Sequence, residues 1–365
     1  MAGNVKSSGP GGSRPLVAPE LLPALEVLPS FDFSEEVLRV LQASMGVAPQ
    51  KRPPLLPEQE AVACEQKLIP GSPGSPEVRV LVYTPPSGKV DAGARPASGP
   101  TAPTAPAGMR PATQPDPAMR PAYLHMHGGG YVIGTPEIND ASNRSLAALL
   151  GCIVVSVDYR LAPQTRFPGA LEDCYAALKW LHAQASQLGI DRTRIAIGGE
   201  SAGAGHAAAL ALLARKRGDV EICLQLLDSP MLDDRTGSTS DPHPYCGEFV
   251  WTRNSNRFGW RSLLGVEPGG PDVPVEAVPA RATDLAGLPP AFIIVGALDL
   301  FLEEDLEYGR RLIRAGVPTE LHVIPGAFHG FTVAGGQAPQ VLTCMRLRNE
   351  ALARAFAGAT VRVST

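Results

Sequence analysis

The chain has 365 residues, of which 44% are hydrophobic and 19% charged, and its formal net charge is -4. This balance is typical of a globular protein with one large core or two small ones. The charge gives no electrostatic basis for binding nucleic acid or an anionic membrane, and no apolar run reaches membrane-spanning length. The N-terminus is polar, without the apolar segment of a secretory signal, so a cytoplasmic location is expected.

The N-terminal 60 residues are predicted to form a flexible tail over residues 1–14 and then two short amphipathic helices within residues 22–41. Ser34 suits the N-cap of the second helix, and two glutamates follow it, where acids complement the helix dipole. Prolines end this region. Strands are then expected at residues 61–69 and 78–83.

Residues 85–121 break the composition, with ten prolines and eight alanines but no Leu, Ile, Phe, Tyr or Trp. Such a segment cannot offset its ordering entropy by burial, so it is predicted to be a disordered loop. A proline-rich binding motif is the alternative interpretation.

From residue 122 onward, strands and helices alternate. Strands are predicted at residues 122–127, 153–158, 195–197, 223–228, 292–295 and 321–324. Helices are predicted at residues 139–150, 168–185, 204–215, 303–315 and 340–356, with Pro168 in a first turn and Gly316 as a C-cap. This alternation predicts an α/β fold with a mainly parallel sheet and helices on both faces.

Residues 229–280 interrupt that alternation with a long polar segment that carries Phe249, Trp251, Phe258 and Trp260. We interpret it as a cap inserted over the active site and completed by the N-terminal helices. A surface excursion whose aromatic rings pack on the body is the alternative. The chain therefore divides into residues 1–60 (tail and cap helices), 61–228 (first part of the core), 229–280 (cap) and 281–365 (second part of the core).

Six cysteines lie too far apart for a C-x-x-C pair, which disfavours a metal or redox site. They are Cys64, Cys152, Cys174, Cys223, Cys246 and Cys344. Cys152 and Cys223 adjoin apolar strand-like runs and are expected to be buried thiols.

The most informative stretch is Gly199-Glu200-Ser201-Ala202-Gly203, which fits G-x-S-x-G between a predicted strand and a predicted helix. That context is typical of a nucleophile elbow, where glycines permit a tight turn and leave the serine hydroxyl at its tip. Ser201 is therefore the candidate nucleophile.

An activated serine needs a base and an acid that orients the base. His329 follows the last predicted strand and Asp299 follows the preceding one, at the carboxyl ends where parallel sheets place reactive groups. Three other histidines fall inside predicted helices or a strand, namely His182, His206 and His322. The order Ser201, Asp299, His329 is the order found in α/β-hydrolases.

A glycine run, Gly128-Gly129-Gly130, follows His127 at the end of another predicted strand. Residues without side chains let backbone N–H groups face a bound oxyanion, so Gly128, Gly129 and Ala202 are the expected donors.

With these motifs in place, the chain resembles the hormone-sensitive-lipase family of esterases, the bacterial family IV carboxylesterases. The matching stretches are residues 127–134, 158–163, 199–203, 298–299 and 328–331. The resemblance implies an α/β-hydrolase fold with a mostly parallel eight-stranded sheet flanked by helices, a helical cap, and hydrolysis of short- to medium-chain esters. Tyr131, Trp251, Phe258 and Trp260 are the candidate substrate-binding residues. Two departures are Gln164, where the family usually has Glu, and the unusual length of loop 85–121.

The implied reaction is two-step acyl transfer through an acyl-enzyme, with no metal and no organic cofactor. The expected partner is a small-molecule ester, and the resemblance admits a homodimer paired through the last strand. An amidase, lactonase or deacetylase could use the same triad. A non-catalytic small-molecule receptor on the same fold is a further alternative, which the presence of His329 disfavours.

Overall fold

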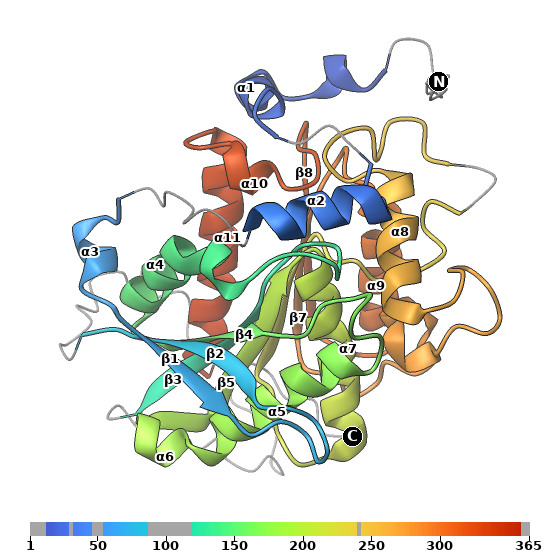
Figure 1. Cartoon of the computed structure of the whole chain (residues 1–365). Helices are drawn as coiled ribbons and strands as arrows, with labels where there is room; N and C mark the ends of the chain where they lie inside the picture. The colour runs from blue at the N-terminus through green and yellow to red at the C-terminus, as the bar shows by residue number, and fades with distance from the viewer. Residues whose placement is uncertain (1–11, 29–31, 46–53, 87–118, 239–241, 359–365) are drawn as a thin grey trace.

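The structure is a computed structural model that describes residues 12–28, 32–45, 54–86, 119–238 and 242–358. A sheet of eight strands runs through it in the order β1-β2-β4-β3-β5-β6-β7-β8 (Figure 1). The strands are β1 (Ala63–Ile69), β2 (Val78–Thr84), β3 (Arg120–Met126), β4 (Ile153–Asp158), β5 (Ile190–Glu200), β6 (Leu224–Asp228), β7 (Ala291–Gly296) and β8 (Thr319–Ile324). β2 is antiparallel to both of its neighbours, and the remaining pairs are parallel. The predicted eight-stranded, mostly parallel sheet is confirmed.

Helices cover both faces of the sheet. One face carries α5 (Gly169–Ala183), α6 (Ala185–Leu188), α7 (Ala202–Arg217) and α9 (Leu302–Arg314). The other face carries α4 (Asp140–Leu150), α10 (Phe331–Ala334) and α11 (Pro339–Phe356). Because neighbouring side chains of a strand point to opposite faces, each strand contributes to two separate apolar clusters.

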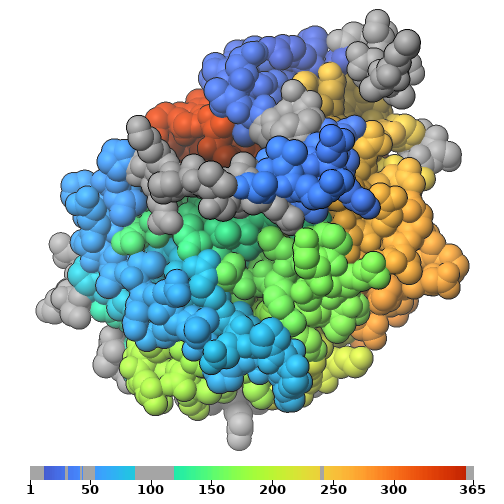
Figure 2. All heavy atoms as spheres, viewed as in Figure 1, coloured from blue at the N-terminus to red at the C-terminus, as the bar shows by residue number. Residues whose placement is uncertain are grey.

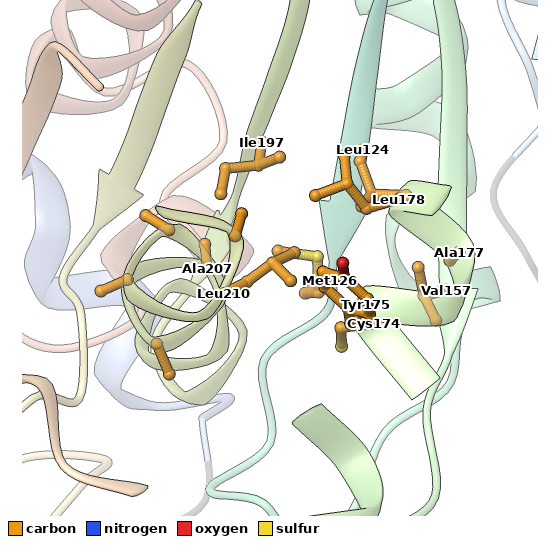
Figure 3. Packing of buried hydrophobic residues seen from close by; sticks show 14 of the residues in the cluster. Leu124, Met126, Val157, Cys174, Tyr175, Ala177, Leu178, Ile197, Ala207 and Leu210 are labelled. Carbon is orange, nitrogen blue, oxygen red and sulfur yellow. The ribbon is translucent and has the colours of Figure 1, made fainter. Parts of the chain in front are cut away.

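The cluster beneath α5 and α7 shows how the sheet is held (Figure 3). Leu124 and Met126 of β3 point from the sheet toward these two helices, and Leu178 and Leu210 are among the helix residues that meet them. All four side chains are fully buried. Full burial of a leucine contributes about 1.5–3 kcal/mol, so this layer fixes the strands that carry the site.

Four strands begin earlier than predicted: β7 by one residue, β3 and β8 by two, and β5 by five. β5 starts at Ile190 rather than residue 195. Ile190 pairs with Arg120, and the register shifts before pairing resumes at Ile195, so the polar residues 191–194 form an irregular part of the strand that lacks the apolar pattern. β3 starts at Arg120, which lies inside the predicted loop 85–121, and pairs with Ile190. The Arg120 guanidinium donates hydrogen bonds to the carbonyls of Pro85 (2.8 Å) and Pro86 (3.3 Å), so both ends of that segment meet. Residues 87–118 lie outside the described residues.

The end of the predicted tail is ordered, which corrects its boundary; residues 1–11 lie outside the described residues. Ser13 is buried and donates its backbone N–H to the Glu248 carboxylate at 2.6 Å. The short helices η1 (Arg14–Leu16), η2 (Pro19–Leu21) and α1 (Leu22–Leu25) follow. Ala18 donates its N–H to the Gly326 carbonyl at 3.0 Å, which ties this segment to the loop after β8.

Between β6 and β7 the chain forms α8 (Arg253–Leu264), η5 (Val275–Ala277) and η6 (Pro279–Arg281). The helix α2 (Glu35–Met45) lies against this segment (Figure 2), and its Leu38 is buried in the same apolar cluster as Trp260. Ser34 accepts the Val37 N–H at 3.2 Å, as expected of an N-cap. The remaining helices are η4 (Pro136–Asn139) and α3 (Pro57–Glu60). The division into four segments stays a prediction.

The structure also tests the expectations about one helix start and about the cysteines. Pro168 is the N-cap of α5 rather than a first-turn residue. Cys152 is buried as expected, but Cys223 is only half-buried, and no disulfide joins the six cysteines, all of which lie in the described ranges. Within those ranges, every helix is too short or too polar to cross a bilayer.

Candidate active site

Ser201 occupies the sharp turn between β5 and α7. Its φ of 56° lies in the left-handed region that non-glycine residues rarely adopt. The turn is held by a hydrogen bond from the Ser201 N–H to the Asp228 carbonyl at 2.8 Å. A Cβ atom at Gly199 or at Gly203 would lie 2.1 Å from the Met126 carbonyl oxygen. Both glycines are therefore required by the close approach of β3, as the G-x-S-x-G pattern predicts.

His329 joins the serine to an acid. Its Nε2 lies 3.0 Å from Ser201 Oγ, and its Nδ1 lies 2.9 Å from Asp299 Oδ2. All three side chains are buried, and the other carboxylate oxygen of Asp299 accepts the Phe301 N–H at 3.0 Å. Because an ionised carboxylate only accepts hydrogen bonds, a neutral His329 carries its proton on Nδ1 and turns the Nε2 lone pair to the serine hydroxyl.

The other histidines that the sequence assigned to helices and a strand are found there. His182 lies in α5 and His206 in α7. His322 lies in β8, where its Nε2 is 2.7 Å from the Glu320 carboxylate. The structure therefore brings His329 to the serine and places these three in other surroundings.

The glycine loop lies beside the nucleophile. A Cβ atom at Gly128 would be 3.1 Å from the Glu200 carbonyl oxygen and 3.6 Å from Ser201 Cβ. Gly129 has a φ of 127°, which only glycine adopts readily. The N–H groups of Gly128, Gly129 and Ala202 have no acceptor among the residues that the structure describes. They are thus available to an oxygen atom of a ligand, which is what the predicted oxyanion hole requires.

His127, to which the sequence analysis gave no role of its own, fixes that loop. Burial lowers the pKa of His127 to about 4, so the imidazole is neutral at pH 7. Its Nδ1 lies 2.8 Å from the Gly128 carbonyl oxygen. The ring stacks on Tyr159 with 4.2 Å between centroids, and the Tyr159 hydroxyl donates to the His127 carbonyl at 2.6 Å. Tyr159 could have been suspected of a role at the site from the sequence, because it comes directly after the strand β4.

The four candidate substrate-binding residues share one apolar cluster but differ in their distance from the triad. The Trp251 ring lies 6.3 Å from the His329 ring, centroid to centroid. Tyr131 and Trp260 instead pack edge to face on each other at 5.2 Å. Phe258 is buried on α8 in the same cluster. Of the four, Trp251 is thus the residue whose ring lies beside that of His329. Substrate contact stays a prediction for all four.

Three charged residues behind the serine escaped the sequence analysis. Arg348 of α11 bridges the carboxylates of Glu200 and Asp228, with both N–O distances at 3.1 Å. The signal that could have found Glu200 and Asp228 is an acidic residue at the last position of a strand. No group of three or more His, Cys, Asp or Glu side chains is arranged to hold a metal ion in the described parts of the chain.

This arrangement suits nucleophilic acyl transfer. It offers a serine oxygen, a base in hydrogen-bond contact with that oxygen, an acid that orients the base, and backbone donors beside them. The parts are contributed by the ends of β3, β5, β7 and β8, which the sheet brings to one edge.

Comparisons with known proteins agree with this chemistry. A family profile described as the α/β hydrolase fold matches residues 123–333. Esterase LipI of Mycobacterium tuberculosis is 35% identical over 282 residues, which cover 77% of this chain and 83% of LipI. An ethyl acetate hydrolase of Pseudomonas putida is 34% identical over 229 residues, which cover 61% of this chain and 70% of that protein. The solved structure of a bacterial heroin esterase has a TM-score of 0.77 and 36% identity, covering 94% of this chain and 98% of its own.

Proposed function

Because this chain belongs to the hormone-sensitive-lipase-like family of α/β-hydrolases and is a carboxylic ester hydrolase, we propose that Ser201, His329 and Asp299 carry out the hydrolysis. One observation carries the proposal: His329 contacts the serine oxygen at 3.0 Å and the aspartate at 2.9 Å in one buried chain of hydrogen bonds. A base within about 2.6–3.2 Å of the proton donor is what general-base catalysis requires.

Acylation begins when Ser201 Oγ attacks the ester carbonyl carbon and His329 Nε2 takes the hydroxyl proton. Asp299 keeps the imidazole in the correct tautomer and stabilises the imidazolium that forms. The negative charge on the carbonyl oxygen is met by the N–H groups of Gly128, Gly129 and Ala202. The bond to the alkoxide then breaks, His329 returns its proton to the leaving oxygen, and an acyl-serine ester remains.

Deacylation repeats these steps with water as the nucleophile. His329 removes a proton from the water, the oxygen attacks the acyl carbon, and the same N–H groups stabilise the second oxyanion. The serine oxygen then leaves and takes the proton from His329. The products are a carboxylic acid, an alcohol and free enzyme, so the cycle needs no redox partner.

We further propose that the substrates have short or medium acyl chains of roughly two to eight carbons. Trp251 supports this limit, because its ring is close to both His329 and the glycine loop: a Cβ atom at Gly130 would lie 2.0 Å from Trp251 Cη2. A bulky ring so close to the reacting atoms bounds the space for a chain. Each methylene that fits contributes up to about 0.8 kcal/mol, so kcat/KM should rise with length and then stop rising.

A series of p-nitrophenyl esters from acetate to palmitate tests the proposed chain length. A value of kcat/KM that still climbs at sixteen carbons would contradict the bounded site. A matched p-nitroanilide of the best acyl group tests the amidase alternative, which would require the anilide to be cleaved as efficiently as the ester. Complete lack of turnover together with tight ester binding would favour the receptor alternative.

A further inference from the structure

Five polar side chains form a continuous chain of contacts behind the nucleophile turn. In order they are Ser156, His125, Glu200, Arg348 and Asp228. Four of them come from β4, β3, β5 and β6, which are neighbours in the sheet, and Arg348 comes from α11. They lie on the face opposite the apolar layer of Figure 3, to which residues one position away on three of these strands, Val157, Met126 and Leu227, contribute.

The contacts have the distances of good hydrogen bonds and ion pairs. His125 Nδ1 lies 2.8 Å from Ser156 Oγ, and His125 Nε2 lies 2.9 Å from Glu200 Oε2. Arg348 Nη2 lies 3.1 Å from the second carboxylate oxygen of Glu200, and its Nη1 lies 3.1 Å from Asp228 Oδ2. One guanidinium therefore joins two carboxylates, which a lysine ammonium cannot do with the same geometry.

This bridge is largely buried. The Arg348 side chain is only 13% exposed, and Glu200 stands directly opposite Asp228 in the pairing of β5 with β6. Burial raises the pKa of Asp228 to about 6 although Arg348 opposes it. Burial would also raise the pKa of Glu200, but His125 and Arg348 outweigh it and hold that pKa at about 2. Without the guanidinium, two facing carboxylates would have to move apart or take up a proton.

The same residues adjoin the reacting groups through the backbone. Glu200 immediately precedes Ser201, and the Asp228 carbonyl accepts the Ser201 N–H at 2.8 Å. His125 lies two residues before His127, which holds the Gly128 carbonyl. The chain of contacts therefore links the strand end that carries the nucleophile with the strand ends on either side of it.

We infer that Arg348 is a positioning residue for Ser201. By clamping Glu200 and Asp228 it fixes the ends of β5 and β6, and so aims the serine oxygen at His329 and holds it beside the glycine loop. The inference rests on the proposed role of Ser201. Since a misplacement of about 1 Å can lower a rate by about 10²-fold, loss of the clamp should act on the chemical step more than on substrate binding.

The test compares Arg348→Met, Arg348→Lys and Glu200→Gln with a matched control, Arg346→Met. Arg346 lies on the same helix but is exposed, and it pairs with Glu350. Two measurements are made on the full chain: kcat and KM for p-nitrophenyl acetate, and the rate and final extent of labelling by a fluorophosphonate, which reacts with an activated serine.

For Arg348→Met we expect kcat and the labelling rate constant to fall together, by roughly 30- to 100-fold. KM should stay within about threefold, and the final labelled fraction should equal that of the wild type. Arg348→Lys should lose about tenfold, since one carboxylate keeps its partner. Arg346→Met should match the wild type.

Two results would overturn the inference. One is a folded Arg348→Met that labels at the wild-type rate. The other is a labelled fraction that falls while the rate per labelled molecule is unchanged, because this would show a purely structural role. If Arg348→Met does not fold, Arg348→Lys and Glu200→Gln decide the question in the same assay. An unreactive wild type would overturn the proposed function and this inference with it, whereas equal reactivity of wild type and variants overturns the inference alone.

Discussion

The sheet edge that carries the triad and the segment around α8 are built in different ways. Ser201, Asp299 and His329 each follow the end of a strand within a few residues, so their positions depend first on the pairing of the strands. The segment around α8 depends instead on partners more than 200 residues away: Phe33 donates its N–H to Ser255 Oγ at 3.0 Å, and its ring lies 5.4 Å from that of Trp251.

Because of this difference, substitutions in the triad and substitutions around α8 should have different kinds of effect on activity. The triad should depend on local geometry and fail completely when one atom is removed. The segment around α8, because it contacts distant parts of the chain, should respond gradually and through pairs of residues.

The largest effect is expected at the sheet edge. Ser201→Ala should lower kcat by about 10⁴- to 10⁶-fold while leaving the melting temperature close to that of the wild type, because it deletes one oxygen atom. His329→Ala should behave similarly. His322→Ala is the matched control and should keep its activity, since His322 pairs with Glu320 on β8. A Ser201→Ala variant that retains a tenth of wild-type turnover would contradict the assignment.

A coupled effect is expected where Trp251 meets the glycine loop. Gly130→Ala should lower kcat/KM by about 10- to 100-fold, because the new methyl group would meet the Trp251 ring and the φ of Gly130 is 57°. Trp251→Ala removes the clash but leaves the backbone strain. The double variant should therefore lose less activity than the sum of the two single losses predicts, and exact additivity would show that the two residues act independently.

A smaller effect, on stability, is expected beneath the glycine loop at His206. Its Nε2 is buried without a partner among the described residues, and burial lowers its pKa to about 3. Because an unfolded histidine titrates near 6.5, the unfolded state binds an extra proton between these pH values, so stability falls as the pH drops below 6.5. His206→Leu should remove this loss, which amounts to about 2 kcal/mol at pH 5.

The measurement for His206→Leu is chemical unfolding at pH 7 and at pH 5. The stabilising difference from the wild type should be about 1–2 kcal/mol at pH 7, from removal of an unsatisfied polar atom, and should grow at pH 5. A difference that is the same at both pH values would show that the imidazole titrates normally in the folded protein.

The smallest effect is expected from deleting most of residues 87–119 and joining the ends through a short Gly/Ser turn. Pro85 and Pro86 already meet the Arg120 guanidinium, so a short connection spans the gap. Closure free energy changes by only about 0.6 kcal/mol per doubling of loop length. Activity should stay within about twofold of the wild type, and a folded but inactive variant would assign the segment a role at the site.

The alternating architecture could be predicted from the sequence, and so could the candidates Ser201, Asp299 and His329. Residues that follow a strand end can be identified from their local motif, without knowing which distant residues they contact. The sequence could not place Arg348, since that residue acts only when α11 covers the same face of the sheet as Glu200. It also missed the first residues of β5, because residues 191–194 are polar and lie where the pairing register with β3 shifts.

The anchoring of the N-terminal segment has a consequence during protein synthesis. Ser13, Ala18 and Phe33 contact Glu248, Gly326 and Ser255 respectively. A ribosome delivers residues 12–28 and 32–45 before these partners, so the early segments must wait until residues up to Gly326 have emerged. We therefore expect a nascent chain to stay without hydrolytic activity until Gly326 and His329 have left the exit tunnel. A chaperone that holds this early segment would then delay the onset of activity without changing its final level.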